Sequence, residues 1–143
     1  MRPFLDKVRS GELEPPPIMQ LLGMQLAEVD EGRAVVTMTT DPAVHANPMG
    51  TIHGGILCDV ADAAMGIAFA STLGEGESFT TLELKTSFLR PVWKTTLRAE
   101  AAVLQRGRTV GLVECTVTDG DGKMVARASS TCLTLRGEQA RGR

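Results

Sequence analysis

The residues best suited to chemistry lie close together, between Asn47 and Asp62. In this segment His53 is followed by two glycines, Gly54 and Gly55, at the point where a long apolar run begins. Glycines lack a Cβ atom, so a ligand can approach their backbone closely. If the apolar run is a helix, the free N–H groups at its start favour developing negative charge, such as that on the oxygen of a polarised carbonyl. One preorganised donor of this kind stabilises a transition state by roughly 2.7–4 kcal/mol.

Asp62 follows about two helical turns later, inside the apolar run. An ionised carboxylate is costly in such surroundings unless it is paired or used. Near a polarised carbonyl carbon it can act as a nucleophile or as a general base toward water. The alternative is a structural acid satisfied by backbone donors. Asp59 lies three residues earlier near the same helix face, where it would either raise the pKa of Asp62 or serve at an interface or a cap.

The other polar and sulfur side chains of this region carry weaker signals. Asn47 can donate from its amide, and His53 can donate or accept, although a structural role in the glycine turn is the preferred interpretation of His53. His45 is interpreted as a loop residue. Neither histidine has a second ligand at His/Cys/Glu spacing, so no metal site is predicted. Cys58 has no basic partner to lower the pKa of its thiol and is interpreted as a core residue.

The element that must position these groups is the run 56–70, in which 12 of 15 residues are apolar. It shows no alternation and is longer than a typical strand, so the sequence predicts a helix. A helix that is apolar on every side must be buried on every side.

Four long alternating segments follow the predicted helix, at 78–89, 93–105, 109–119 and 123–135. Their three-residue connections leave no room for crossover helices, so these strands pair antiparallel. Two shorter strands are predicted before the helix, at 24–29 and 33–40. The prediction is therefore an α+β fold, in which one long antiparallel sheet of five or six strands wraps around one central buried helix.

A single sheet covers only one side of such a helix, and the chain supplies no second sheet. A second copy of the chain is the economical cover, so the sequence predicts a homodimer at least. The alternative is that the N-terminal segment covers the exposed side.

Length and charge limit the remaining possibilities. The 143 residues fit one domain, expected at 18–136, between a flexible N-terminal leader at 1–17 and a disordered tail at 137–143. The net charge of −2 and the aromatic content of 3% argue against a nucleic-acid partner, which would need a basic face or stacking platforms. The sequence contains no run of 18 apolar residues, so it predicts no membrane-spanning helix. Three cysteines without C-x-x-C spacing fit a reducing compartment, so a cytoplasmic location is expected.

The pattern His53-Gly54-Gly55, six further residues and Asp62, with Asn47 six residues before the histidine, resembles the hotdog-fold acyl-CoA thioesterases. The closer similarity is to the PaaI-like branch, which includes the 4-hydroxybenzoyl-CoA thioesterases of the HGG type. The segments TTLELKTSFLRP (80–91) and DGDGKMVARASSTCLTL (119–135) continue the resemblance, which covers roughly 18–135.

The resemblance implies a role for individual residues. Asp62 occupies the family's catalytic carboxylate position, and Gly54 matches the residue whose backbone N–H polarises the thioester carbonyl. Asn47 matches a polar residue that helps to hold the carbonyl or the lytic water, and Thr81 matches a Ser/Thr position that assists the water in some members. In the family these groups come from two subunits of a dimer, and the dimers often associate further, so a dimer of dimers (a homotetramer) is expected.

The coenzyme A part of such a substrate carries phosphates, which need cations at the mouth of the pocket. Arg90 at a strand end, and Arg106 and Arg108 in a short loop, are expected to supply them. Gly55 is expected to contact the substrate, and His53 is grouped with the catalytic residues of the motif. No cofactor is expected, because coenzyme A is part of the substrate.

The resulting prediction is an acyl-CoA thioesterase that hydrolyses an acyl- or aryl-CoA to the free acid and coenzyme A. One alternative is a non-catalytic acyl-CoA binding or sensing module on the same fold. The other is a hotdog-fold hydratase or dehydratase, against which the double glycine followed by Asp62 argues. The side chains of Met65, Phe69, Phe79 and Phe88 are expected to line the acyl pocket, indicating an apolar or aryl acyl group.

Overall fold

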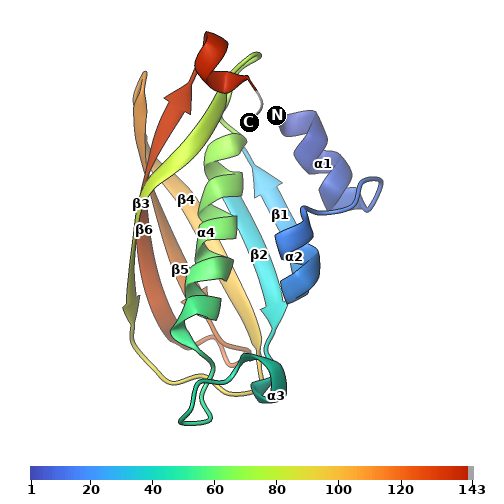
Figure 1. The fold of residues 1–143 in the computed structure, drawn as a ribbon, viewed down its shortest axis with the longest axis vertical. Coiled ribbons are helices and arrows are strands. Elements are labelled where there is room, and N and C mark those ends of the chain that lie inside the picture. The colour runs from blue at the N-terminus through green and yellow to red at the C-terminus, as the bar shows by residue number, and fades with distance from the viewer. Residues whose placement is uncertain (142–143) are drawn as a thin grey trace.

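A six-stranded antiparallel sheet wraps around helix α4 (Gly54–Ala70) in the computed structural model, which describes residues 1–141 (Figure 1). The strands are β1 (Met24–Asp30), β2 (Arg33–Thr39), β3 (Ser78–Phe88), β4 (Thr96–Arg106), β5 (Val110–Thr118) and β6 (Met124–Leu135). Their order in the sheet is β1-β2-β4-β5-β6-β3, and every neighbouring pair is antiparallel. The predicted hotdog-type fold class is therefore confirmed.

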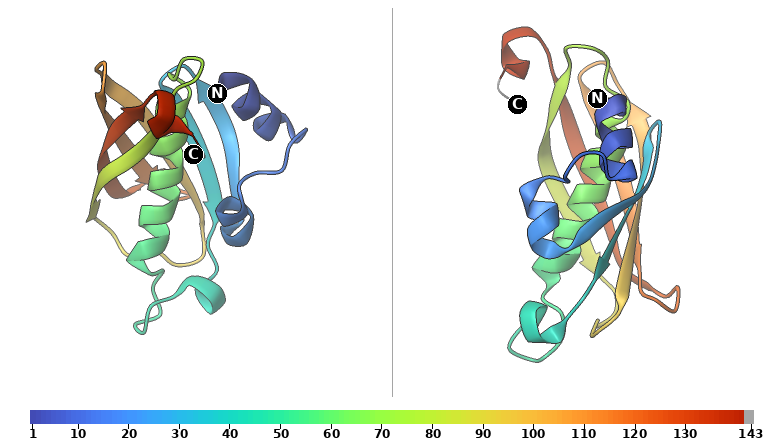
Figure 2. Two further views of the ribbon diagram at one scale, coloured as in Figure 1. Left: turned by 45° about the horizontal axis from the view of Figure 1, so that its top comes forward. Right: turned by 90° about the vertical axis from the view of Figure 1, so that its right-hand side faces the viewer.

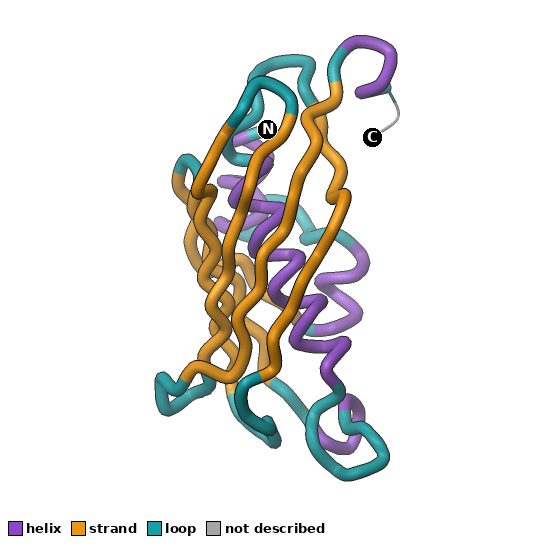
Figure 3. The backbone as a smooth tube through the Cα atoms, turned by 90° about the vertical axis from the view of Figure 1, so that its left-hand side faces the viewer, coloured by secondary structure: helices purple, strands orange, loops and turns teal. Residues whose placement is uncertain are grey.

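Helix α4 lies on one side of the sheet (Figure 3). Its apolar side chains pack against the strands. Val60, Met65 and Phe69 are fully buried in this core. The opposite face of α4 is only partly covered, and both Asp59 and Asp62 are exposed on it. The sequence predicts a helix buried on every side, whereas a single chain buries only the side that faces the sheet.

Two N-terminal helices, α1 (Arg2–Ser10) and α2 (Pro17–Leu22), lie beside β1 (Figure 2). The guanidinium of Arg2 donates to the Val29 carbonyl at 2.8 Å, and Leu5 is buried. The segment 1–17, expected to be a flexible leader, therefore contains a helix with its own attachment to the sheet. The expected tail, 137–143, begins with a short 3-10 helix, η1 (Gly137–Ala140), and its last two residues lie outside the described part.

The segment 41–55 contains the short helix α3 (Pro42–His45), which Asp41 caps by accepting the Ala43 N–H at 2.9 Å. Strand β4 begins at Thr96, three residues later than expected. Just before it the Thr40 hydroxyl donates to the Trp93 carbonyl at 2.6 Å and accepts the Thr95 N–H at 3.0 Å, while the Thr95 carbonyl accepts the Thr40 N–H at 2.8 Å. No helix among residues 1–141 is long and apolar enough to cross a membrane.

Candidate functional site

The first residues of α4 offer a backbone N–H group to a ligand. His53 caps the helix, since its Nδ1 atom accepts the Gly55 N–H at 2.9 Å. Among residues 1–141 no acceptor bonds the neighbouring Gly54 N–H. A Cβ atom at Gly54 would lie 2.8 Å from Cζ of Phe88, so the close approach of this ring requires a glycine. The geometry leaves the Gly54 N–H free to bind a ligand, whereas the Gly55 N–H, expected to contact the substrate, is already used by His53.

Asn47 holds the loop that leads into α4. Its Oδ1 accepts the backbone N–H groups of Met49 and Thr51, at 2.9 and 3.3 Å, and its Nδ2 donates to the Thr51 hydroxyl at 2.8 Å. These bonds occupy its amide within the loop. Asn47, Gly54 and Arg90 nevertheless line one surface pocket of about 400 Å³, so the fold brings three of the expected site residues together.

Asp62 lies on the open face of α4, in different surroundings. The side chain is exposed to solvent on one side, but the apolar groups around it partly desolvate the carboxyl and so raise its pKa, and the nearby charge of Asp59 raises that pKa further. Among the described residues, no side-chain or backbone donor bonds the carboxylate. A structural acid satisfied by backbone donors would have its pKa lowered instead, so the geometry disfavours that alternative.

Asp62 and Thr81 line the same apolar groove, whose volume is about 300 Å³. Of the side chains expected to line an acyl pocket, Phe79 lines this groove. The expectation for Met65 and Phe69 was wrong, because both are 0% exposed in the core between α4 and the sheet. Phe88 lines the other pocket, beside Gly54.

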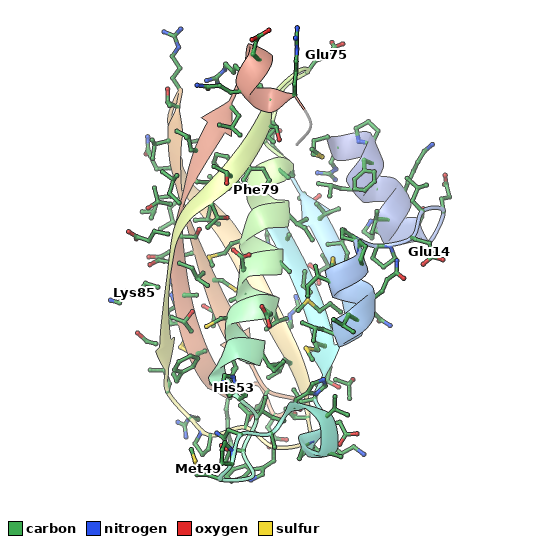
Figure 4. The ribbon with its side chains drawn as sticks, viewed as in Figure 1. Glu14, Met49, His53, Glu75, Phe79 and Lys85 are labelled. Atoms are coloured by element: carbon green, nitrogen blue, oxygen red, sulfur yellow. The ribbon has the colours of Figure 1, made fainter. Side chains whose placement is uncertain are left out.

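The two groups of residues are separated along one helix. Asp62 follows Gly54 by eight residues, which at 1.5 Å per residue places them about 12 Å apart along the axis. In Figure 4 His53, the residue before Gly54, lies at the lower end of α4, and Phe79, which lines the groove with Asp62, lies beside its upper half. Within one chain, a single small group such as a carbonyl could not contact both Gly54 and Asp62.

The three arginines expected to bind phosphate have different positions. Arg90 is exposed beside the Gly54 pocket. Arg106 lies at the other end of α4, where it donates to Thr72 at 3.1 Å, pairs with Glu77 at 3.3 Å and stacks over Phe69. These contacts assign Arg106 a structural role in place of the expected phosphate contact.

Arg108, the third arginine, lies two residues beyond Arg106 and is exposed.

No group of three or more His, Cys, Asp or Glu residues within 1–141 could hold a metal ion. The thiols are poor nucleophiles where burial is deep, since desolvation raises the pKa of Cys115 to about 12.

Two features of the site were missed by the sequence analysis. Helix α1 contributes Phe4, Leu5 and Val8 to the groove, and Met1, which precedes the helix, also lines it; the spacing of these residues by three and four was a readable helical signal. Gly66 lies in the groove wall one turn after Asp62, and an isolated glycine within a helical pattern was the available sign.

Comparisons with known proteins show which family the sequence and the fold resemble. A sequence profile of the Thioesterase superfamily matches residues 49–126. The acyl-coenzyme A thioesterase PaaI of Escherichia coli is 35% identical over 106 residues, which are 73% of each chain. The 1,4-dihydroxy-2-naphthoyl-CoA hydrolase of Listeria monocytogenes is 25% identical over 114 residues, covering 80% of this chain and 92% of the other.

Solved structures show the same likeness. The Escherichia coli PaaI protein superposes with a TM-score of 0.83 and 28% identity, over 93% of this chain and 94% of the other. A phenylacetic acid degradation-related protein of Ralstonia eutropha superposes with a TM-score of 0.82 and 34% identity, over 90% and 98% of the two chains.

Proposed function

Since the chain belongs to the thioesterase superfamily and is a thioester hydrolase, we propose that it cleaves acyl-CoA thioesters to a free acid and coenzyme A. The names of two relatives support a coenzyme A thioester as substrate, although their acyl groups differ. The observation that carries the proposal is the Asp62 carboxylate, unpaired among the described residues and placed with Thr81 in an apolar groove.

In the proposed reaction the Gly54 N–H donates to the thioester carbonyl oxygen and stabilises the negative charge that develops there. Asp62 then acts in one of two ways. It attacks the carbonyl carbon and expels the coenzyme A thiolate, leaving a mixed anhydride that water hydrolyses, or it takes a proton from a water that attacks the same carbon. In this proposal Thr81, which lines the same groove as Asp62, orients that water. The capping bond of His53 supports a structural role for it and argues against proton transfer by this histidine.

We further propose that the active enzyme is a homodimer in which Gly54 of one copy faces Asp62 of the other. The separation of about 12 Å within one chain supports this arrangement. Strand β3 supports it too, because it is an edge strand of 11 residues with exposed Leu82 and Phe88, and such an edge pairs readily with another chain. A second copy would also cover the open face of α4.

Other parts of the proposal rest on fewer residues. Arg90 would bind phosphate of coenzyme A beside the Gly54 pocket. Pairing of dimers into a homotetramer follows from the resemblance alone, and size measurement by light scattering tests it. Activity without a cofactor predicts that dialysis against a chelator leaves turnover unchanged. A cytoplasmic location is supported by the three free cysteines, Cys58, Cys115 and Cys132.

Thiol release from short, long and aryl acyl-CoAs tests the function, with Asp62→Asn as the variant. This change removes the charge and keeps the volume of the side chain. We expect turnover by the wild type and a loss of about 10²–10⁴-fold in the variant. Binding of a non-hydrolysable acyl-CoA thioether should persist. Tight binding with no turnover by the wild type would instead indicate an acyl-CoA sensing module.

A further inference from the structure

The apolar groove beside Asp62 runs over the open face of α4, with α1 and α2 on one side and β3 on the other. Thirteen of the fifteen residues that line it are apolar, and Asp62 and Thr81 are the other two. Three large apolar side chains of the lining are left about half open to solvent: Met1 is 44% exposed, Phe4 45% and Ile18 53%. Apolar surface gathered in this way marks a site that binds something apolar.

Gly66 is the most informative residue of the groove wall. Glycine is a poor choice inside a helix, and its φ here is not in the left-handed region that would require it. Packing does not require it either, because a Cβ atom would lie 3.5 Å from Cζ of Phe79, an ordinary contact distance. The consequence of glycine at this position is open space in the groove, one turn away from Asp62.

Helix α1 fixes the other wall. Arg2 ties it to β1 by its bond to the Val29 carbonyl, and its guanidinium lies 3.6 Å from Asp30. Phe4 and Val8 then face the groove from α1, while Phe79 faces it from β3. The groove is therefore built by segments distant in the sequence, and its width depends on side chains at defined positions.

We propose that this groove holds the acyl group of the thioester, and that Gly66 and Ile18 set the length of the acyl group accepted. This inference rests on the proposed function, because it places the reacting carbonyl at Asp62. The substrates are thioesters of uncharged, apolar acyl groups of medium length or with an aryl end. Acyl groups that end in a carboxylate are rejected, since the only charged side chain of the lining is the acid Asp62.

The test is kcat/KM for a series of saturated thioesters from acetyl-CoA to decanoyl-CoA, with succinyl-CoA as the charged probe. For the wild type we expect a rise of about fourfold per methylene until the groove is filled. In Gly66→Ala the ratio of octanoyl-CoA to acetyl-CoA should fall by about tenfold or more. In Ile18→Ala the preferred length should increase. Leu21→Ala is the matched control, because Leu21 is 79% exposed on the same helix and lies outside the lining.

Titration of S-alkyl-CoA thioethers separates this inference from the proposed function. If affinity rises with alkyl length and Gly66→Ala weakens the long thioethers while no thioester is cleaved, the groove assignment stands and the thioesterase proposal fails. If thioesters are cleaved but Gly66→Ala does not change the ratio of kcat/KM for octanoyl-CoA to that for acetyl-CoA, the groove assignment is overturned and the thioesterase proposal stands. Dissociation of the oligomer by Gly66→Ala, with length preference intact, would also overturn it, since the groove would then be a contact between copies.

Discussion

The first turn of α4 and its middle are two regions of one helix with opposite designs. At the first turn nearly every polar group has a local partner: His53 caps Gly55, and Asn47 bonds its own loop. In the middle Asp62 has no such partner among the described residues, and its surroundings raise its pKa. One region is a rigid donor and the other an unsatisfied acid.

This difference fits the separate roles proposed for the two regions. A donor that stabilises developing charge must be held in place before the reaction, because reorientation during the reaction would cost part of its benefit. An acid that accepts a proton or attacks carbon must keep its lone pairs free. Hydrogen bonds to Asp62 would lower its reactivity, whereas hydrogen bonds around Gly54 improve the donor.

Removal of the Gly54 N–H is the most severe test of the donor region. Gly54 is the first residue of α4, a position where proline is well tolerated, and the extended conformation of His53 suits a following proline. Gly54→Pro should therefore keep the helix and lose about 10²–10³-fold in kcat. Thiol release measures the loss, and circular dichroism confirms that the helix remains.

Gly54→Ala is the matched control for this variant. It adds the same Cβ atom near Phe88 but keeps the N–H, and the exposed ring of Phe88 can move. Its kcat should lie well above that of Gly54→Pro. Equal losses in the two variants would show that the ring contact matters rather than the donor.

Mixed dimers test whether the two regions meet across subunits. A dimer of one Gly54→Pro chain and one Asp62→Asn chain contains one site with both halves intact and one with both altered. Random mixing of the two inactive variants should then restore about one quarter of wild-type activity. Co-expression with two affinity tags isolates the mixed species. If donor and acid act within one chain, no mixture recovers activity.

Much of the fold could be predicted from the sequence, because its signals are local. The uniformly apolar run 56–70 has no strand alternation, and three-residue connections force antiparallel pairing, so helix α4 and the strands after it were predicted nearly to their ends. Helix α1 was missed because its helical spacing rests on few apolar residues in a short segment. Its position depends on Arg2 reaching the Val29 carbonyl, a contact between residues far apart in the sequence.

The sequence offered candidates for the site, but it could not predict how these residues are arranged. Glycine before an apolar run and an acid inside it have a chemical meaning that spacing alone conveys. Whether Asn47 points at a ligand or at its own loop, and whether Arg106 is free or paired with Glu77, depends on tertiary contacts. The same holds for Phe69, whose aromatic side chain suits a core as well as a pocket.

The charge of Asp59 gives a smaller test of the acid region. It contributes to the raised pKa of Asp62, after the larger effect of burial. In the proposed mechanism catalysis needs the ionised form of Asp62, so activity should fall as pH decreases through this pKa. Asp59→Asn should lower the pKa and move the acidic limb of kcat/KM to lower pH, with a severalfold gain on that limb and little change at alkaline pH. An unmoved limb would assign Asp59 to an interface or a cap instead.

The smallest expected effect concerns His53, where a cap and a proton-transfer role predict different results. Loss of the bond from Gly55 in His53→Ala should cost about 0.5–2 kcal/mol of stability, measured by urea unfolding. His53→Asn should restore most of it, because an asparagine oxygen can accept the same N–H. If His53 only caps the helix, the asparagine variant also keeps the pH profile of kcat/KM, since the proposed acid, Asp62, lies about two turns further along α4. If that variant lost the basic or the acidic limb, His53 would take part in proton transfer and not only cap the helix.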